Sequence, residues 1–108
     1  SLYSGYENII ERIIRAVDGD VPSGRDYHLM LLKRALNPVE GVRPVIISLE
    51  TFRLLDELRT YRHKFRNIYL YLLSPKRITE LAYTGLDSFQ HFEKDINAFK
   101  EFLTSRPE

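Results

Sequence analysis

Apolar residues recur at steps of three and four along most of this chain, and no segment alternates apolar and polar residues over a useful length. The clearest series occupies the last third of the chain: Ile78, Ala82, Gly85, Phe89, Phe92, Ile96, Phe99 and Leu103. Steps of three and four repeat the α-helical period, whereas a half-buried strand needs a period of two. The pattern therefore predicts an all-α protein built from helices that pack through apolar stripes.

Residue types suited to caps and turns divide the chain into four helices. We expect these helices at about residues 3–17, 27–36, 49–73 and 75–103. Asp26, Ser48 and Ser74 suit the N-cap positions of the last three, because their short side chains accept a hydrogen bond from a free backbone N–H. Pro75 suits a first helical position. Gly85 lies inside the last segment, but the apolar phase continues through it, so we predict one long helix rather than two.

The four segments predict a single domain over residues 1–108, an up-and-down four-helix bundle whose third and fourth helices form a long hairpin. Val45-Ile46-Ile47 is too short for a strand and has no partner run, so we expect an extended segment before the third helix. Because the sequence starts at Ser1 and not at Met, we also expect native residues before it and a longer first helix.

Composition limits the classes of function. A chain of 108 residues with 44% hydrophobic and 29% charged residues suits one soluble globular domain with one core. A net charge of +1 gives no whole-chain attraction to nucleic acid or membrane, so any anion binding must be local. The absence of cysteine excludes disulfides and thiol catalysis, and no apolar run approaches the roughly 20 residues needed to span a bilayer. We expect a cytoplasmic protein that needs no cofactor or metal and contacts no membrane.

The expected third helix carries both an apolar stripe and a basic one. Its apolar stripe comprises Leu54, Leu58, Tyr61, Phe65, Ile68 and Leu72. Its basic stripe, with two polar residues at the far end, comprises Arg59, Arg62, His63, Arg66, Asn67 and Tyr69. From Arg53 to Arg66 there are five Lys or Arg against two acids, a balance of +3. We therefore expect this helix to pack with one side and to present cations on another.

Two of these arginines lack a local acidic partner. Arg59 follows Asp56 by three residues, whereas no Asp or Glu lies three or four residues from Arg62 or Arg66. Their partner must come from another helix, another chain or a bound anion. Guanidinium groups bind phosphate oxygens in bidentate fashion, and His63 could move a proton near neutral pH. A phosphodiester is the ligand we expect, against the simpler interpretation of a solvated charged face.

The other polar residues offer weaker candidates. We expect His28 and His91 to be partly buried or surface residues rather than ligands, because no His or acid spacing on one helix resembles a metal site. Ser88, His91 and Asp95 share one helix face, but we expect that face to be solvated and not to hold a catalytic triad.

The stretch from Arg62 to Tyr69 resembles the Arg-x4-His-x-Tyr motif of the HEPN superfamily, in particular HepT-like toxins. The resemblance covers roughly residues 3–81. It includes, in the expected order, the segments Tyr3-Ser4-Gly5-Tyr6-Glu7-Asn8-Ile9, Tyr27-His28-Leu29-Met30-Leu31-Leu32, Val42-Arg43-Pro44-Val45-Ile46 and Leu58-Arg59-Thr60-Tyr61-Arg62-His63. The motif has moderate specificity alone and a higher one in this helical context.

The resemblance implies a fold, an activity and partners. HEPN proteins are small helical bundles that dimerise through the motif helix, and many are metal-independent ribonucleases with a composite site at the interface. The motif arginine, here Arg62, would hold the scissile phosphate, and the motif histidine would take the proton of the ribose 2′-hydroxyl. HepT-like toxins are paired with a nucleotidyltransferase antitoxin that can attach AMP to the motif tyrosine, here Tyr69. Arg59, His63 and Arg66 would assist.

The sequence departs from the motif at one position, because the motif histidine falls on Asn67. An amide cannot act as a general base, although it can hydrogen-bond a ribose or a phosphate. Three explanations stay open: a naturally inactive relative, partial substitution by His63, or an engineered replacement. Whether the chain is an enzyme is thus left open.

Three functions follow. The first is a HepT-like, homodimeric RNA endonuclease toxin. The second is a non-catalytic module of the same fold that binds nucleotide, RNA or a protein partner through the basic face. The third is a dimerisation domain without a ligand.

Overall fold

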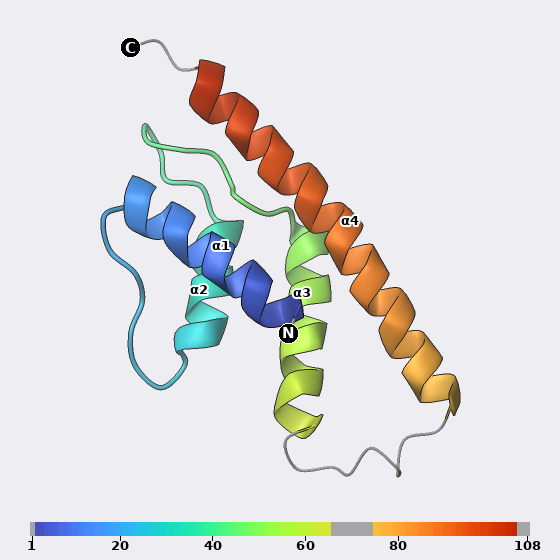
Figure 1. Ribbon diagram of the computed structural model, residues 1–108. Coiled ribbons are helices and arrows are strands. Elements are labelled where there is room, and N and C mark those ends of the chain that lie inside the picture. The colour runs from blue at the N-terminus through green and yellow to red at the C-terminus, as the bar shows by residue number, and fades with distance from the viewer. Residues whose placement is uncertain (1, 66–74, 106–108) are drawn as a thin grey trace.

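Four α-helices make up the fold: α1 (Leu2–Val17), α2 (Tyr27–Leu36), α3 (Leu49–Phe65) and α4 (Pro75–Ser105) (Figure 1). The computed structural model describes residues 2–65 and 75–105, apart from the side chains of residues 2, 61–65, 78 and 81. Within these ranges there is no β-strand, and the one β-bridge joins Val39 to Arg43. The prediction of an all-α bundle is confirmed. None of the helices in these ranges is long and apolar enough to cross a membrane.

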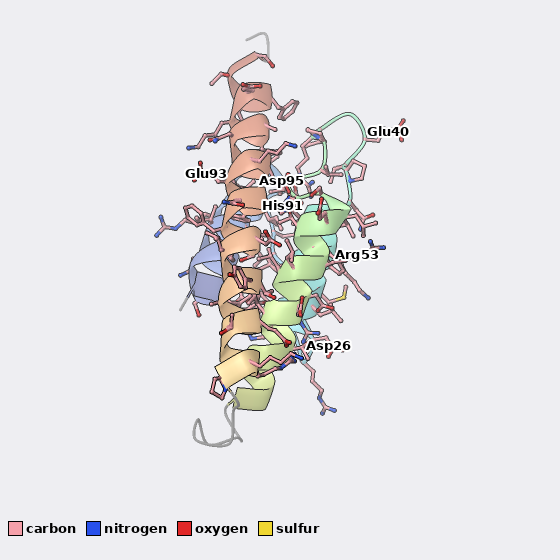
Figure 2. The ribbon with its side chains drawn as sticks, turned by 90° about the vertical axis from the view of Figure 1, so that its right-hand side faces the viewer. Asp26, Glu40, Arg53, His91, Glu93 and Asp95 are labelled. Carbon is pink, nitrogen blue, oxygen red and sulfur yellow. The ribbon has the colours of Figure 1, made fainter. Side chains whose placement is uncertain are left out.

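The long hairpin predicted from the sequence is present. In Figure 1, α2, α3 and α4 run in alternating directions, and α1 crosses obliquely in front of α2. Figure 2 shows α3 and α4 side by side. The 31 residues of α4 span ~46 Å at ~1.5 Å per residue, so α4 is much longer than its neighbours. The end of α3 at Phe65 and the start of α4 at Pro75 lie at the same end of the molecule.

The core draws on all four helices and on the segment that precedes α3. Its fully or almost fully buried apolar residues are Tyr3, Tyr6, Ile10, Ile14, Leu31, Leu32, Ala35, Ile46, Ile47, Leu55, Phe92 and Phe99. The backbone N–H groups of Ile46 and Ile47 donate to the carbonyl of Ala35 over 2.8 and 3.2 Å. Residues 45–47 therefore dock on the last turn of α2, but the chain bends at Ile46 and Ile47, which corrects the prediction of an extended segment.

The predicted caps have different outcomes. Ser48 caps α3, because its Oγ accepts the Thr51 N–H over 3.2 Å. Asp26 occupies the N-cap position of α2 but makes no side-chain cap bond, since its ψ of 31° is not the extended backbone of a capping residue. Pro75 begins α4, and α4 continues through Gly85 without a break. The Ser74 cap and the continuation of α3 to residue 73 lie outside the described residues.

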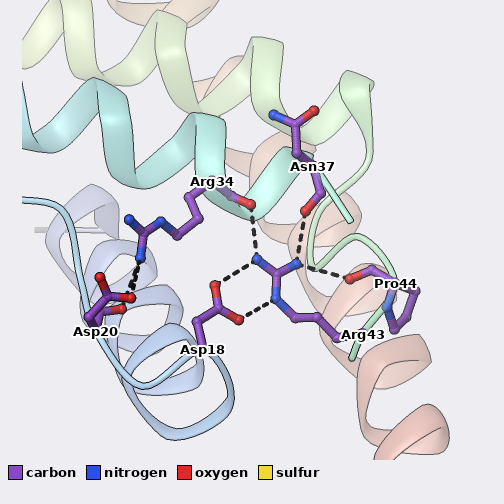
Figure 3. Close-up of polar contacts among 6 residues, drawn as sticks. All are labelled: Asp18, Asp20, Arg34, Asn37, Arg43 and Pro44. Atoms are coloured by element: carbon purple, nitrogen blue, oxygen red, sulfur yellow. Dashed lines mark hydrogen bonds and ion pairs between the residues drawn. The ribbon is translucent and has the colours of Figure 1, made fainter. Parts of the chain in front are cut away.

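A buried arginine ties together three segments that meet at one end of the bundle (Figure 3). The Arg43 side chain has no exposed surface, and its Nε and Nη2 donate to the two carboxylate oxygens of Asp18 over 2.7 and 2.9 Å. Its remaining N–H groups donate to the carbonyls of Asn37, Pro44 and Arg34 over 2.9, 3.0 and 3.2 Å. All five guanidinium donors are thus used. At the end of α2, the Asn37 carbonyl gains a partner, and the Arg34 carbonyl, which also accepts the Asn37 N–H over 3.3 Å, gains a second one.

We expect Arg43→Met to lower the free energy of unfolding by about 3–5 kcal/mol, because it leaves the Asp18 carboxylate buried without its cation. Chemical denaturation measures the change. Arg34→Met is the matched control. Arg34 binds Asp20, whose side chain is 78% exposed, so this change should cost less than about 1 kcal/mol. Equal losses in the two variants would contradict a specific role for the buried pair.

Candidate functional site

Arg59 is the one residue of the predicted basic stripe whose side chain the structure describes. Its Nε and Nη2 lie 3.0 and 2.9 Å from Oδ1 of Asp56, one turn earlier on α3. The local ion pair expected from the sequence is therefore present. Both side chains are about one third exposed, so the guanidinium keeps access to solvent while Asp56 offsets part of its charge.

The helical repeat of α3 shows how Arg62, the next arginine along the helix, is placed relative to the core. Leu55 is completely buried, and Arg59 and Arg62 follow it at steps of four and three. Residues at these spacings lie on one side of a helix, so Arg59 and Arg62 share by register the side of α3 that carries Leu55 into the core, which we call the basic side of α3. The side chains of Arg62 and His63, and the whole of Arg66, Asn67 and Tyr69, lie outside the described residues.

Helix α3 is held at its N-terminus by a carboxylate from α4. Oδ2 of Asp95 accepts the Ser48 N–H over 2.8 Å and lies 3.1 Å from the Ser48 Oγ. The Ser48 Oγ in turn accepts the backbone N–H of Thr51, a residue that is fully buried. In Figure 2, Asp95 lies beside the start of α3. A negative charge at this place also interacts favourably with the helix dipole. This second capping residue, 47 positions away in the sequence, fixes where α3 begins against α4.

The face shared by Ser88, His91 and Asp95 is buried at Ser88 and partly buried at the other two residues, which corrects the expectation of a solvated face. Ser88 is fully buried, where its Oγ donates to the carbonyl of Gly85 over 2.7 Å and lies 3.1 Å from the Tyr6 hydroxyl. His91 Nε2 lies 3.4 Å from a Glu50 carboxylate oxygen on α3. These polar groups join α4 to α1 and α3, so the three residues have separate structural partners and form no triad.

A second polar cluster, which the sequence reasoning missed, joins α1 to α2. His28 Nδ1 lies 2.7 Å from Glu7, and Arg15 donates to Glu11 over 2.9 Å. Burial raises the pKa of the Tyr27 phenol from 10.0 to about 12, and its hydrogen bond to Glu11 adds to the rise. The hydrogen bond from Arg15, then that from Tyr27, lowers the pKa of Glu11. Every charge in this cluster has a neighbour within the protein, which suits a structural contact.

The described residues offer no rival site. A cavity of about 340 Å³ lies beside the Arg43 cluster and is lined by Val17, Asp18, Asp20, Arg34, Val39 and Val42. Its acidic residues are already paired, Asp18 with Arg43 and Asp20 with Arg34. No group of three or more His, Asp or Glu in the described parts of the chain could hold a metal ion. The basic side of α3 is thus the strongest candidate.

The helical bundle and the comparison with protein families lead to the same class, a HEPN domain of the HepT-like type. A family model described as "HepT-like protein" matches residues 1–103. Because the match spans almost the whole chain of 108 residues, the chain belongs to the family of HepT-like proteins. The resemblance seen in the sequence is confirmed. Comparison with curated proteins and with solved structures gives no significant match.

We expect Asp95→Ala to lower the free energy of unfolding by about 1–2 kcal/mol, because it removes the cap that α4 places on α3. Chemical denaturation again provides the measurement. Asp87→Ala, which removes an exposed carboxylate from the same helix, should change stability by less than about 0.5 kcal/mol. If the two variants are equally stable, Asp95 does not hold α3.

Proposed function

We propose that this chain is a HEPN-type toxin module that acts on RNA, as a homodimer whose composite site uses the basic side of α3. The observation that carries the proposal is the HepT-like family match over residues 1–103. The register of α3 supports it, since Arg59 and Arg62 continue the side that begins with the buried Leu55. Such an arrangement holds the arginines on a rigid helix, which limits the entropy lost when they bind phosphate.

In the proposed reaction, Arg62 binds the scissile phosphate and stabilises the charge that develops on its oxygens. The ribose 2′-oxygen attacks phosphorus, the bond to the 5′-oxygen breaks, and a 2′,3′-cyclic phosphate forms. A base must remove the 2′ proton. Asn67 occupies the position of the motif base and can only hydrogen-bond there, so His63, the one histidine of this segment, is the proposed base that titrates near neutral pH.

Arg59 has a secondary role in this scheme. Two of its nitrogens are directed at Asp56, which leaves N–H donors for a neighbouring phosphate while lowering the local positive charge. Arg66, for which no acid lies within one turn in sequence, is the second proposed phosphate-binding residue. Tyr69 is proposed as the residue that a nucleotidyltransferase-type antitoxin modifies, since AMP attached there would place a further phosphate beside the arginines.

A second candidate function is favoured by Asn67 itself. Without a base at that position, the same basic side would bind RNA or nucleotide and not cleave it. The two candidates share Arg62 as the phosphate ligand and differ only in proton transfer. Restoring the base at position 67 therefore distinguishes the two candidates, whereas removing Arg62 would affect both.

We expect Asn67→His to raise the rate of RNA cleavage by roughly 10²–10⁴-fold, the usual contribution of a positioned general base. Arg62→Ala, added to that variant, should remove the gain. Arg53→Ala is the matched control, because Arg53 lies on α3 and points away from α4 in Figure 2. Cleavage of a labelled single-stranded RNA, with the cyclic phosphate product identified, provides the measurement. An Asn67→His variant that binds RNA without any gain in cleavage would favour the binding module.

A further inference from the structure

A histidine–glutamate pair joins the first turn of α2 to α1. Nδ1 of His28 lies 2.7 Å from Oε2 of Glu7, and the two side chains are 55% and 13% exposed. An ionised carboxylate only accepts hydrogen bonds, so Nδ1 carries the hydrogen of this bond. Nε2, the second ring nitrogen, has no hydrogen-bond partner among the described residues. The carboxylate thus fixes the ring through one nitrogen and leaves the other available to a ligand.

We propose that His28 is the general acid of the proposed RNA cleavage and that Glu7 is its positioning residue. The inference rests on the proposed function and deepens it, because that reaction has a base for the 2′ proton but no donor for the leaving 5′-oxygen. As the bond between the 2′-oxygen and phosphorus forms, the bond from phosphorus to the 5′-oxygen breaks. The proton on Nε2 of the His28 imidazolium moves to this 5′-oxygen, and solvent restores it before the next turnover.

The helical repeat places His28 on the side of α2 that enters the core. Leu31 and Ala35 follow it at steps of three and seven and are completely buried, so the three residues lie on one side of the helix. Helix α3 has the same arrangement, because Leu55 is completely buried and Arg59 follows it by one turn. The inward sides of both helices therefore carry a core residue and, one turn away, a polar side chain.

The two polar turns lie near each other, because α2 and α3 run in opposite directions (Figure 1). The Ala35 carbonyl accepts the Ile46 N–H over 2.8 Å, which fixes the last turn of α2 beside the segment that leads into α3. His28 precedes Ala35 by seven residues, or ~10 Å at ~1.5 Å per residue. The same ~10 Å along α3 leads from its first residue to Asp56. In Figure 2, Asp26, two residues before His28, lies level with the C-terminal half of α3.

The charges near this pair suit a phosphate bound between α2 and α3. Arg59 binds Asp56 through Nε and Nη2 and keeps further N–H donors. Glu7, the carboxylate beside the imidazole, is already engaged by His28. Packed helices lie about 8–10 Å apart, a distance that an arginine and a histidine side chain together span. One phosphate group between the helices can therefore contact both Arg59 and Nε2 of His28.

An RNA with sulfur in place of the bridging 5′-oxygen tests this role. A thiol ionises far more readily than an alcohol, so the 5′-sulfur leaves without a proton. We expect His28→Ala to slow cleavage of ordinary RNA by roughly 10²-fold or more and of the 5′-thio RNA by less than about threefold. Glu7→Gln should lose about tenfold on ordinary RNA and also recover on the 5′-thio RNA. Each ratio compares two substrates of one variant, so a change in the folded fraction cancels.

His91→Ala is the matched control. His91 also lies beside a glutamate, 3.4 Å from Glu50, but at the start of α3 (Figure 2), so this change should slow neither substrate. The wild-type chain and Asn67→His serve as parents. Equal effects of His28→Ala on both substrates would overturn the inference and leave the proposed function in place. Absence of cleavage of both substrates by both parents would contradict the proposed function and the inference with it.

Discussion

The buried pair between Arg43 and Asp18 is the interaction on which the rest of the fold depends. Its guanidinium joins the end of α1, the end of α2 and the segment that leads into α3, and every one of its donors has a protein acceptor. The next residues, Ile46 and Ile47, enter the core and bond to Ala35 of α2. Ser48 then starts α3 with a cap that Asp95 of α4 reinforces. Each helix is thus placed by polar contacts at one end of the bundle, and α3 and α4 extend from there to the other end.

Much of this architecture could be predicted from the period of the apolar residues and from caps. The four helices, the Ser48 cap and the unbroken α4 follow from local chemistry that acts within a few residues. Which side of each helix is buried could be predicted less accurately. Thr51 and Leu55 are completely buried although they lie beside the apolar stripe of α3, whereas Phe89 and Leu103 of the α4 stripe are exposed. A helix that has neighbours on two sides buries residues on both of these sides, and the sequence pattern does not indicate where those neighbours lie.

The candidate site was predictable in a different way. Arg59 and its partner Asp56 could be paired from their spacing alone, because three residues along a helix bring their side chains together. The family could be recognised from the motif around Arg62 and Tyr69, and the match over residues 1–103 bears this out. The contacts that hold the start of α3 and the buried arginine in place could not be predicted from the sequence. Asp95 lies 47 residues from Ser48, and Asp18 lies 25 residues from Arg43, so neither partner has a local signal.

In the function we propose, the basic side of α3 receives the phosphodiester backbone of RNA. The most direct measurement is the affinity for single-stranded RNA as a function of salt concentration, compared between the wild-type chain, Arg62→Ala and Arg53→Ala. Each phosphate that a cation neutralises contributes about 0.7 to the slope of log affinity against log salt. We expect Arg62→Ala to lower the magnitude of this slope by about 0.7 for each site and Arg53→Ala to leave it unchanged. Equal slopes for the two variants would contradict it.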